Sequence, residues 1–466
     1  MNAERTAAER TAAETASPTR GRPDTADLVA VVLGLTAFAA LLALGRGLTF
    51  FADEWAVIAE RGTTLDSFLV PFNEHWLGLT IIAYRLLFDL VGFGSYLPYL
   101  ALLAALHVLV AGEVYVLVRR TSGPLVALGA TAIVLFFGSG FENLFWGMQI
   151  GFVGAIALGL AALLVLEGEP TRGRVVVGVG LVTAGLMTSG FGLFMLALVT
   201  LDLLLDGRRR RLAVAMLIPA GVYATWYLAF GRNGVAAIQD PFTIDALIRT
   251  PAFVFEGLAV ASGSVLGVGP VAGHLVVLGL VVMAIVQVLR GQPVPARTLA
   301  CVGAVVAEYA VVGLVRSQLG SDAAGYTRYA YLSGILLIIG LAAWIGVPRL
   351  PDDRRLRLAA VSTAVVVLTL SLTWNTVLLI EGRSLFGERA DRTRAAITVA
   401  LEELPPGLDP DRAKLLDRTV TRLREVLAEH GAPLTDSLAS DAVPPVDPVL
   451  VAKVRAQLAS TWSASR

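Results

Sequence analysis

The chain has 466 residues, of which 56% are apolar and 16% are charged, and its 37 basic residues balance 37 acidic ones. A soluble protein of this length could not cover its surface with so few charges, whereas repeated apolar stretches of about 20 residues fit a lipid bilayer. The zero net charge gives no indication of nucleic acid binding. The single cysteine, Cys301, excludes disulfides within the chain and leaves no thiol cluster for a metal. The composition therefore predicts an all-α fold, a polytopic transmembrane helical bundle.

The two ends of the chain differ from its apolar middle. Residues 1–26 alternate Ala, Glu, Thr and Arg, and they lack the short charged start and cleavage site of a signal peptide. We interpret them as a disordered cytoplasmic tail before a transmembrane domain over 27–381. We expect residues 382–466, which are less apolar, to form a small helical tail outside the membrane.

Apolar segments separated by short loops predict about 11 transmembrane helices. Residues 174–206 could form one long helix, but glycines around Thr188 and Ser189 favour two short ones. Residues 250–267 are apolar enough to span, yet we place them as an outer-surface or re-entrant helix with Glu256 facing protein or water. The expected spans are 27–45, 97–118, 123–139, 149–167, 174–188, 192–206, 212–230, 269–289, 298–315, 329–347 and 358–380.

The distribution of arginine predicts the orientation of these helices. With the N-terminus in the cytoplasm, the inner loops carry 14 arginines, among them the run Arg208 to Arg211, whereas the longer outer loops carry seven. Because arginine is enriched in cytoplasmic loops, this asymmetry places the N-terminus inside. After an odd number of spans, residues 382–466 are extracytoplasmic. The predicted location is the plasma membrane.

The first outer loop, about 46–96, is long enough to carry structure of its own. Within it, Trp76 to Gly92 is predicted to be a helix with Arg85 and Asp89 four residues apart on one face. Such a helix lies along the membrane surface rather than crossing it. We therefore expect this loop to form a shelf above the membrane.

Two Asp-Pro pairs predict helices in the C-terminal tail. Asp409 begins the first helix, which Gly431 ends, and Asp447 begins the second. The tail lacks a dense motif of catalytic residues, so we interpret it as a small accessory cap. The apolar stripe of the first helix is Leu416, Val420, Leu423 and Leu427, and that of the second is Leu450, Val451, Val454 and Leu458.

Polar and aromatic residues near the outer face gather in four places along the chain. Two adjacent carboxylates end the first span, and the other groups lie in the first loop, between spans three and four, and before span ten. Carboxylates at the lip of a bilayer are costly to desolvate, so their position requires a reason. We expect all four groups to converge on one outer cavity. They are Asp53 and Glu54; Asn73, Glu74, His75 and Trp76; Glu142, Asn143, Trp146 and Gln149; and Arg316, Arg328 and Tyr329.

This distribution resembles the GT-C class of integral-membrane glycosyltransferases, in which the first span ends in an acidic motif and a long first outer loop carries interfacial helices. The resemblance covers roughly 27–381. It implies a polyprenyl-phosphate sugar donor, a glycan or lipid acceptor activated by Asp53 or Glu54, and a lipid phosphate near Arg316, Arg328 and Tyr329. Because this chain has Asp-Glu rather than Asp-x-Asp, a divalent cation, Mg²⁺ or Mn²⁺, stays an open alternative.

The chemistry of sugar transfer needs these residue types. A carboxylate takes or orients the acceptor proton, and a cation stabilises the leaving phosphate. Arginine suits the second role because its planar fork contacts two phosphate oxygens. Adjacent residues point about 100° apart on a helix, so only one of Asp53 and Glu54 is expected to face the substrate. We choose Asp53.

Each candidate also has an ordinary structural interpretation. The two carboxylates could solvate a helix end, Glu74 and His75 could cap the surface helix instead of forming an acid/base or metal pair, and the arginines could snorkel. Trp55, Trp76 and Trp146 could mark the membrane interface rather than stack on sugars. The isolated His107 and His274 are expected to make core hydrogen bonds, not to bind metal.

Two other classes of function compete with the transferase. A secondary transporter could use Glu113, Glu256 and Glu308 as a proton path, although such proteins usually have paired halves with broken helices and only one broken pair is visible here. A non-catalytic lipid-binding or assembly protein of the membrane would show the same outer cluster without turnover. In every case membrane lipids are expected partners, and nucleic acid is not.

Overall fold

The computed structural model describes residues 24–464 except 169–170, 235–242, 404–407 and 434–445. The predicted tail over 1–26 therefore lies almost wholly outside the described residues. Its last residues begin the first helix, because Asp24 and Asp27 form a capping box that satisfies free backbone N–H groups there.

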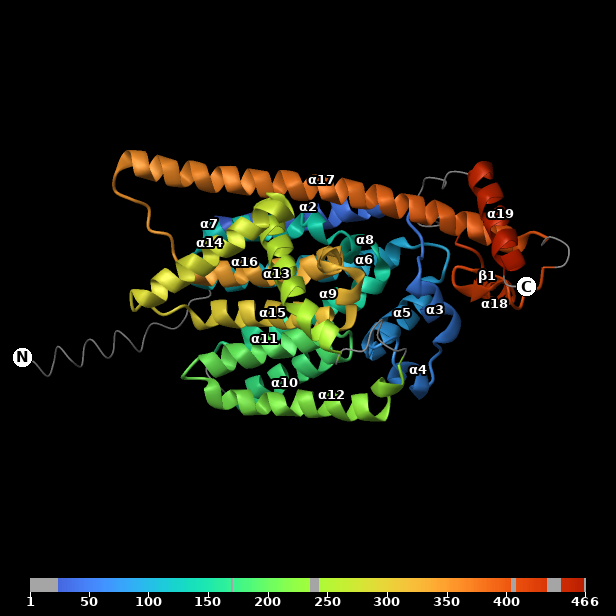
Figure 1. Cartoon of the computed structure of the whole chain (residues 1–466), viewed down its shortest axis with the longest axis horizontal. Helices are drawn as coiled ribbons and strands as arrows, with labels where there is room; N and C mark the ends of the chain where they lie inside the picture. Colours follow the sequence, from blue (N-terminus) through green and yellow to red (C-terminus); the bar gives the residue numbers. More distant parts are fainter. Residues whose placement is uncertain (1–23, 169–170, 235–242, 404–407, 434–445, 465–466) are drawn as a thin grey trace, which may run out of the picture.

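A bundle of long apolar helices makes up most of the molecule (Figure 1). Each predicted span coincides with one of them. The bundle consists of α2 (Thr25–Gly45), α6 (Leu97–Ser122), α7 (Pro124–Leu135), α9 (Ile150–Leu166), α10 (Arg172–Leu186), α11 (Phe191–Leu205), the 3-10 helix η3 (Arg210–Met216) with α12 (Leu217–Ala229), α13 (Ile244–Leu266), α14 (Gly269–Leu289), α15 (Ala296–Arg316), α16 (Thr327–Ile345) and α17 (Arg354–Leu401).

Within the described residues, eight helices are long and apolar enough to cross a membrane, and α7 and α11 are shorter apolar helices. Apolar side chains also cover the outside of the bundle: on α14, Val271 is 83% exposed and Leu275 72% exposed. Such surfaces are stable only against lipid. The predicted all-helical polytopic membrane fold is confirmed, whereas the count of 11 spans stays a prediction.

The segment over 174–206 is broken, as its glycines predict. α10 ends at Leu186 and α11 begins at Phe191. The turn between them is held from the first outer loop, because Leu79 N–H donates to the Met187 carbonyl at 2.9 Å and the Thr80 hydroxyl donates to the Thr188 carbonyl at 2.7 Å. The break thus fixes the outer loop on the bundle.

Two other predictions about the interior agree with the structure. Glu256 on α13 faces His274 on α14 at 2.9 Å. The buried His107 ring lies 2.7 Å from the Tyr331 hydroxyl and 3.2 Å from the Leu135 carbonyl, which is the expected core hydrogen bonding.

One end of the bundle, which we call the basic end, is held together by ion pairs. Arg297 of α15 pairs with Asp202 of α11 and, at 3.0 Å, with Glu167 after α9. Arg209 also contacts Asp202, and Arg120 pairs with Glu167. The predicted inner loops therefore meet at one end, as the arginine distribution requires.

The other end, the cavity end, carries short elements (Figure 1). The predicted surface helix appears as α5. These elements are α3 (Asp53–Glu60), α4 (Leu65–Leu69), α5 (Gly78–Val91), η1 (Gly138–Gly140), α8 (Glu142–Phe145), η2 (Gly147–Gln149), η4 (Gly231–Asn233), η5 (Ser317–Leu319) and η6 (Ser321–Gly325).

The C-terminal tail differs from its prediction in one helix. No helix starts at Asp409; instead Lys414–Leu415 (β1) and Arg418–Thr419 (β2) pair as a hairpin, and the helix α18 begins at Val420. The Asp-Pro signal was overridden because residues 409–413 form turns that precede the hairpin. The end at Gly431 and the second helix, α19 (Pro448–Ala464), agree with the sequence.

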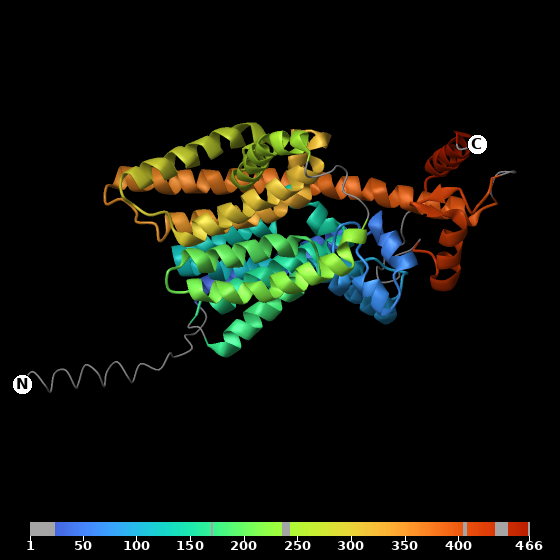
Figure 2. The same ribbon diagram turned by 60° about the horizontal axis from the view of Figure 1, so that its bottom comes forward.

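α17 joins the bundle to this tail without a break. It contains 48 residues and passes through the predicted domain boundary at 381–382. α18 packs on α3 and α19 packs on α17, so the tail closes over the cavity end (Figure 2). Two arginines of α17 also hold the end of α2: Arg383 donates to the Arg46 carbonyl at 2.8 Å and Arg394 to the Gly47 carbonyl at 2.7 Å.

Candidate active site

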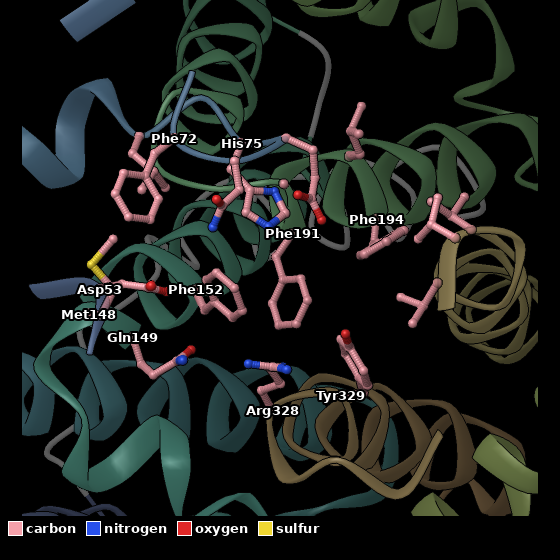
Figure 3. Close-up of a pocket in the computed structure, with 18 of the residues that line it drawn as sticks. Asp53, Phe72, His75, Met148, Gln149, Phe152, Phe191, Phe194, Arg328 and Tyr329 are labelled. Atoms are coloured by element: carbon pink, nitrogen blue, oxygen red, sulfur yellow. The ribbon is translucent and has the colours of Figure 1, made fainter. Parts of the chain in front are cut away.

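A cavity of about 620 Å³ opens at the cavity end of the bundle. Its walls come from the first outer loop, from η2 and α9, from the start of α11 and the turn before it, and from the ends of α12, α15 and α16 at this end of the bundle. Figure 3 shows Asp53 and Gln149 toward one side of this cavity and Phe194 toward the other. The predicted residues that line it are Asp53, Asn73, Glu74, His75, Trp146, Gln149, Arg316, Arg328 and Tyr329.

Asp53 is presented at the first turn of α3 by a strained backbone. The residue before it, Ala52, has φ +48°, a conformation that side-chain-bearing residues rarely adopt and that costs about 1 kcal/mol or more. The loop is fixed because the Trp146 indole N–H donates to the Phe51 carbonyl at 3.3 Å. Burial raises the pKa of Asp53, Arg328 opposes this rise, and Asp417 adds to it.

Glu54 does not line the cavity, which corrects its prediction as a catalytic residue. Its carboxylate is fully buried and accepts hydrogen bonds from the Tyr84 hydroxyl at 2.5 Å, the Tyr96 hydroxyl at 2.9 Å and the Phe51 N–H at 2.7 Å. Tyr96 in turn accepts from the Gly147 N–H at 2.6 Å. Glu54 therefore connects α3, α5, α6 and η2 and positions the loop before Asp53. Burial raises its pKa to about 8 despite these hydrogen bonds.

Glu74 and His75 face the cavity from the first outer loop. The Arg316 guanidinium donates to Glu74 at 2.9 Å. Burial alone would raise the pKa of Glu74, but His75 and Arg316 lower it below its usual value. Burial lowers the pKa of His75, and the Glu74 carboxylate opposes this shift. The position of the His75 ring also requires glycine at residue 190, because a Cβ atom added there would lie only 2.5 Å from His75 Nδ1.

Arg328 lies on the opposite wall, at the start of α16. Its guanidinium is 5.3 Å from the ring centre of Tyr326 and 5.5 Å from that of Tyr329, within cation–π range. Among the described residues Arg328 makes no ion pair, although its positive charge acts to lower the pKa of Asp53. Asn143 donates to the Arg328 carbonyl at 3.4 Å, so this predicted binding residue supports the wall instead of lining the cavity.

Two further predicted contacts lie away from the cavity. Trp76 stacks on Trp226 with ring centres 5.0 Å apart, and its indole N–H donates to the Phe68 carbonyl, so it is part of the packing. Glu142 lies on α8 near Arg389 of α17, outside the first cavity. The sequence places both correctly at this end but cannot show the direction of their side chains.

The sequence analysis did not predict which apolar residues line the cavity. Most of its aromatic and valine side chains come from three helices, and single apolar residues in a membrane helix carry no signal that separates a cavity wall from a lipid-facing surface. The spacing of valines before Arg316 was the one available hint. These residues are Phe191 and Phe194 of α11, Tyr223 and Tyr227 of α12, and Val311, Val312 and Val315 of α15.

The donor set does not fit a divalent cation. Mg²⁺ and Mn²⁺ prefer several oxygen ligands, but Glu54 is turned away and Glu74 is paired with Arg316. Asp53 alone offers a carboxylate from the acidic pair. In the described part of the chain no group of three His, Cys, Asp or Glu side chains is placed to hold a metal. The carboxylates of the transporter hypothesis, Glu113, Glu256 and Glu308, do not line the cavity.

Comparison with known proteins gives one structural similarity. No family model matches the chain, and no curated protein matches it. Among solved structures the chain is similar to ArnT from Cupriavidus metallidurans, crystallised with undecaprenyl phosphate bound, at 14% sequence identity and a TM-score of 0.49. The similarity covers 92% of this chain and 88% of that chain.

Proposed function

We propose that this protein is a membrane glycosyltransferase of the GT-C type, which transfers a sugar from a polyprenyl-phosphate donor to a cell-envelope acceptor at the outer face of the plasma membrane. One observation carries the proposal: one cavity at the end of a membrane bundle combines two carboxylates, two guanidinium groups and an apolar wall. A lipid phosphate ester complements this cavity, because its phosphate is negatively charged and its hydrocarbon chain is apolar.

The two arginines provide the phosphate site. Arg328 makes no ion pair among the described residues, whereas Arg316 is held in place by Glu74. Guanidinium groups bind phosphate oxygens through two parallel hydrogen bonds. The valines of α15 that precede Arg316 face the same cavity, so a polyprenyl chain would lie along α15 and α12 while its phosphate reaches the arginines.

Asp53 provides the base. Its carboxylate would take the proton of the acceptor hydroxyl as that oxygen bonds to the anomeric carbon of the sugar. The bond from this carbon to the phosphate oxygen then breaks, and its electron pair leaves with the phosphate, whose charge Arg328 and Arg316 stabilise. The raised pKa of Asp53 makes it a stronger base, and the rate should rise with pH through that pKa.

The test is sugar transfer by the purified full-length chain in liposomes. Asp53→Asn keeps the size of the side chain but removes the proton acceptor, so transfer should fall by roughly 100- to 10,000-fold. Asp66→Asn is the matched control, since that exposed carboxylate lies on α4 at the same end but lines neither cavity of this end, and it should stay within a few-fold of the native rate. A native rate for Asp53→Asn would exclude Asp53 as the base, and a native protein inactive with every polyprenyl-phosphate sugar would overturn the function.

A further inference from the structure

A second cavity, of about 290 Å³, shares the Asp53 loop with the first. Phe51 and Ala52 line the second cavity, and the next residue, Asp53, lines the first. Three consecutive residues thus border both spaces. The remaining walls come from α17 and from the tip of the C-terminal hairpin, Leu416 and Asp417.

The α17 wall contains two cationic side chains that no described residue neutralises through an ion pair. The Arg389 guanidinium lies 4.7 Å from the ring centres of both Phe51 and Phe386, and Arg392 is exposed. Their neighbours on α17 differ, because Arg383 and Arg394 donate to backbone carbonyls at the end of α2. Two of these four arginines therefore hold the structure together, and the other two face a cavity.

The hairpin tip is strained where it enters this cavity. Leu416 and Asp417 have φ +51° and +59°, in a two-residue turn that ordinarily favours Asn or Gly. Ala52 on the facing wall also has a positive φ, and Asn73 of the first cavity completes the set of non-glycine residues with positive φ in the described chain. Each of the four lines one of the two cavities. Strain of this kind is retained at ligand sites because the surrounding structure holds it.

We propose that the second cavity is the acceptor subsite and that the acceptor carries an anionic group, a phosphate or a carboxylate, bound by Arg389 and Arg392. This assignment rests on the proposed transferase function. The anion would lie on the two guanidinium groups, and the buried Thr393 hydroxyl and the Asp417 carboxylate would contact hydroxyl groups of the acceptor. The reacting hydroxyl would then reach Asp53 past Ala52.

Binding of defined probes to the full-length chain in nanodiscs of phosphatidylcholine tests this assignment, since that lipid carries no net charge. The probes are phosphorylated maltotetraose, tetragalacturonate and unmodified maltotetraose. At least one anionic probe should bind about tenfold or more tightly than maltotetraose, and the pair separates a phosphate from a carboxylate preference.

The double variant Arg389→Gln/Arg392→Gln should lose this preference. Arg354→Gln/Arg355→Gln removes the same charge from the far end of α17 and should keep it. Arg392→Gln alone, at an exposed position, covers the case in which the double variant fails to fold, and it should weaken anion binding by severalfold. Equal binding of anionic and neutral probes, or an unchanged preference in the folded variants, would overturn the site.

Failure of the transferase function is distinguishable from failure of this site. Native protein that transfers no sugar from any polyprenyl-phosphate donor, but still binds anions through Arg389 and Arg392, would overturn the acceptor assignment together with the proposed function and leave an anion site. Native protein that transfers sugar but shows no anion preference would overturn the inference alone.

Discussion

The two ends of the bundle differ in how some of their arginines are paired. At the basic end, Arg297, Arg209 and Arg120 all pair with carboxylates of neighbouring helices. At the cavity end, Arg328 and Arg389 lie over aromatic rings and make no ion pair among the described residues. The four non-glycine residues with positive φ in the described part of the chain are also at the cavity end. Paired charges hold the helices together at one end, whereas at the other end unpaired guanidinium groups lie near strained backbone, the combination on which both proposed sites rest.

The largest expected effect on stability belongs to the basic end. Asp202→Asn should destabilise the fold by about 3 kcal/mol, because Arg297 loses its main partner in a buried network. Asp245→Asn is the control: its pair with Arg249 is exposed on both sides and should contribute less than about 1 kcal/mol. Unfolding in detergent measures both. Equal stability of the two variants would remove the distinction between a structural end and a functional end.

At the cavity end the corresponding change affects activity rather than stability. Arg328→Lys keeps the charge but loses the two-point geometry, so transfer at limiting donor should fall about tenfold, or roughly 1.4 kcal/mol. The unfolding midpoint should stay close to the native value, since Arg328 has no ion pair to lose. Arg249→Lys, on the exposed face of α13, is the control. Undiminished turnover would count against phosphate binding by Arg328.

Glu54 should show its positioning role through pH. Its pKa is raised to about 8 in the folded chain, so stability is greatest below its usual pKa near 4.5 and falls as pH rises through about 8. Glu54→Gln lacks this loss, so the melting temperature of the native protein relative to the variant should decrease between pH 5 and pH 8. Transfer by the variant should fall less than for Asp53→Asn. Parallel melting curves at every pH would argue against a buried protonated carboxyl.

The prediction with the smallest expected effect on the protein concerns the side of the membrane that each end of the bundle faces. Reporter fusions at Gly207 and Gly231 sit at the two ends of η3 and α12. Gly207 lies at the basic end, so we expect the reporter fused there to be in the cytoplasm. We expect the reporter at Gly231 to be on the outer side of the membrane. Reporters on the same side would contradict the topology without touching the chemistry of the site.

Helix positions could be predicted because apolar runs and glycines are local signals. The ends at Gly92 and Gly431 and the break before Phe191 all follow from the sequence. The start at Asp409 failed because the competing hairpin depends on the turn at Leu416 and Asp417, which adopts positive φ without glycine. The helix-capping preference of an Asp-Pro pair gives no information about a competing hairpin.

The site could be predicted only in part, for a related reason. The carboxylate and the arginines were visible as charges at membrane edges. The 100° argument predicted that Asp53 and Glu54 point in different directions, and only Asp53 lines the cavity. The direction of Trp76, which stacks on Trp226, depends on a residue 150 positions away. The second cavity joins Phe51 to Arg389 in the same way. Such pairings arise from tertiary packing and leave no periodicity in the sequence.

The length of α17 also determines how far the C-terminal hairpin lies from the start of this helix at Arg354. Its 48 residues extend about 72 Å at 1.5 Å per residue, more than twice the roughly 30 Å of a hydrocarbon core. Because the helix has no break, it is a spacer of fixed height and rotation that carries the hairpin to the Asp53 loop. Adding seven residues between Arg394 and Leu401 would raise the hairpin by about 10 Å with little rotation, whereas adding one would turn it by about 100°. The height of the hairpin above the bundle is therefore fixed by the number of residues in one helix.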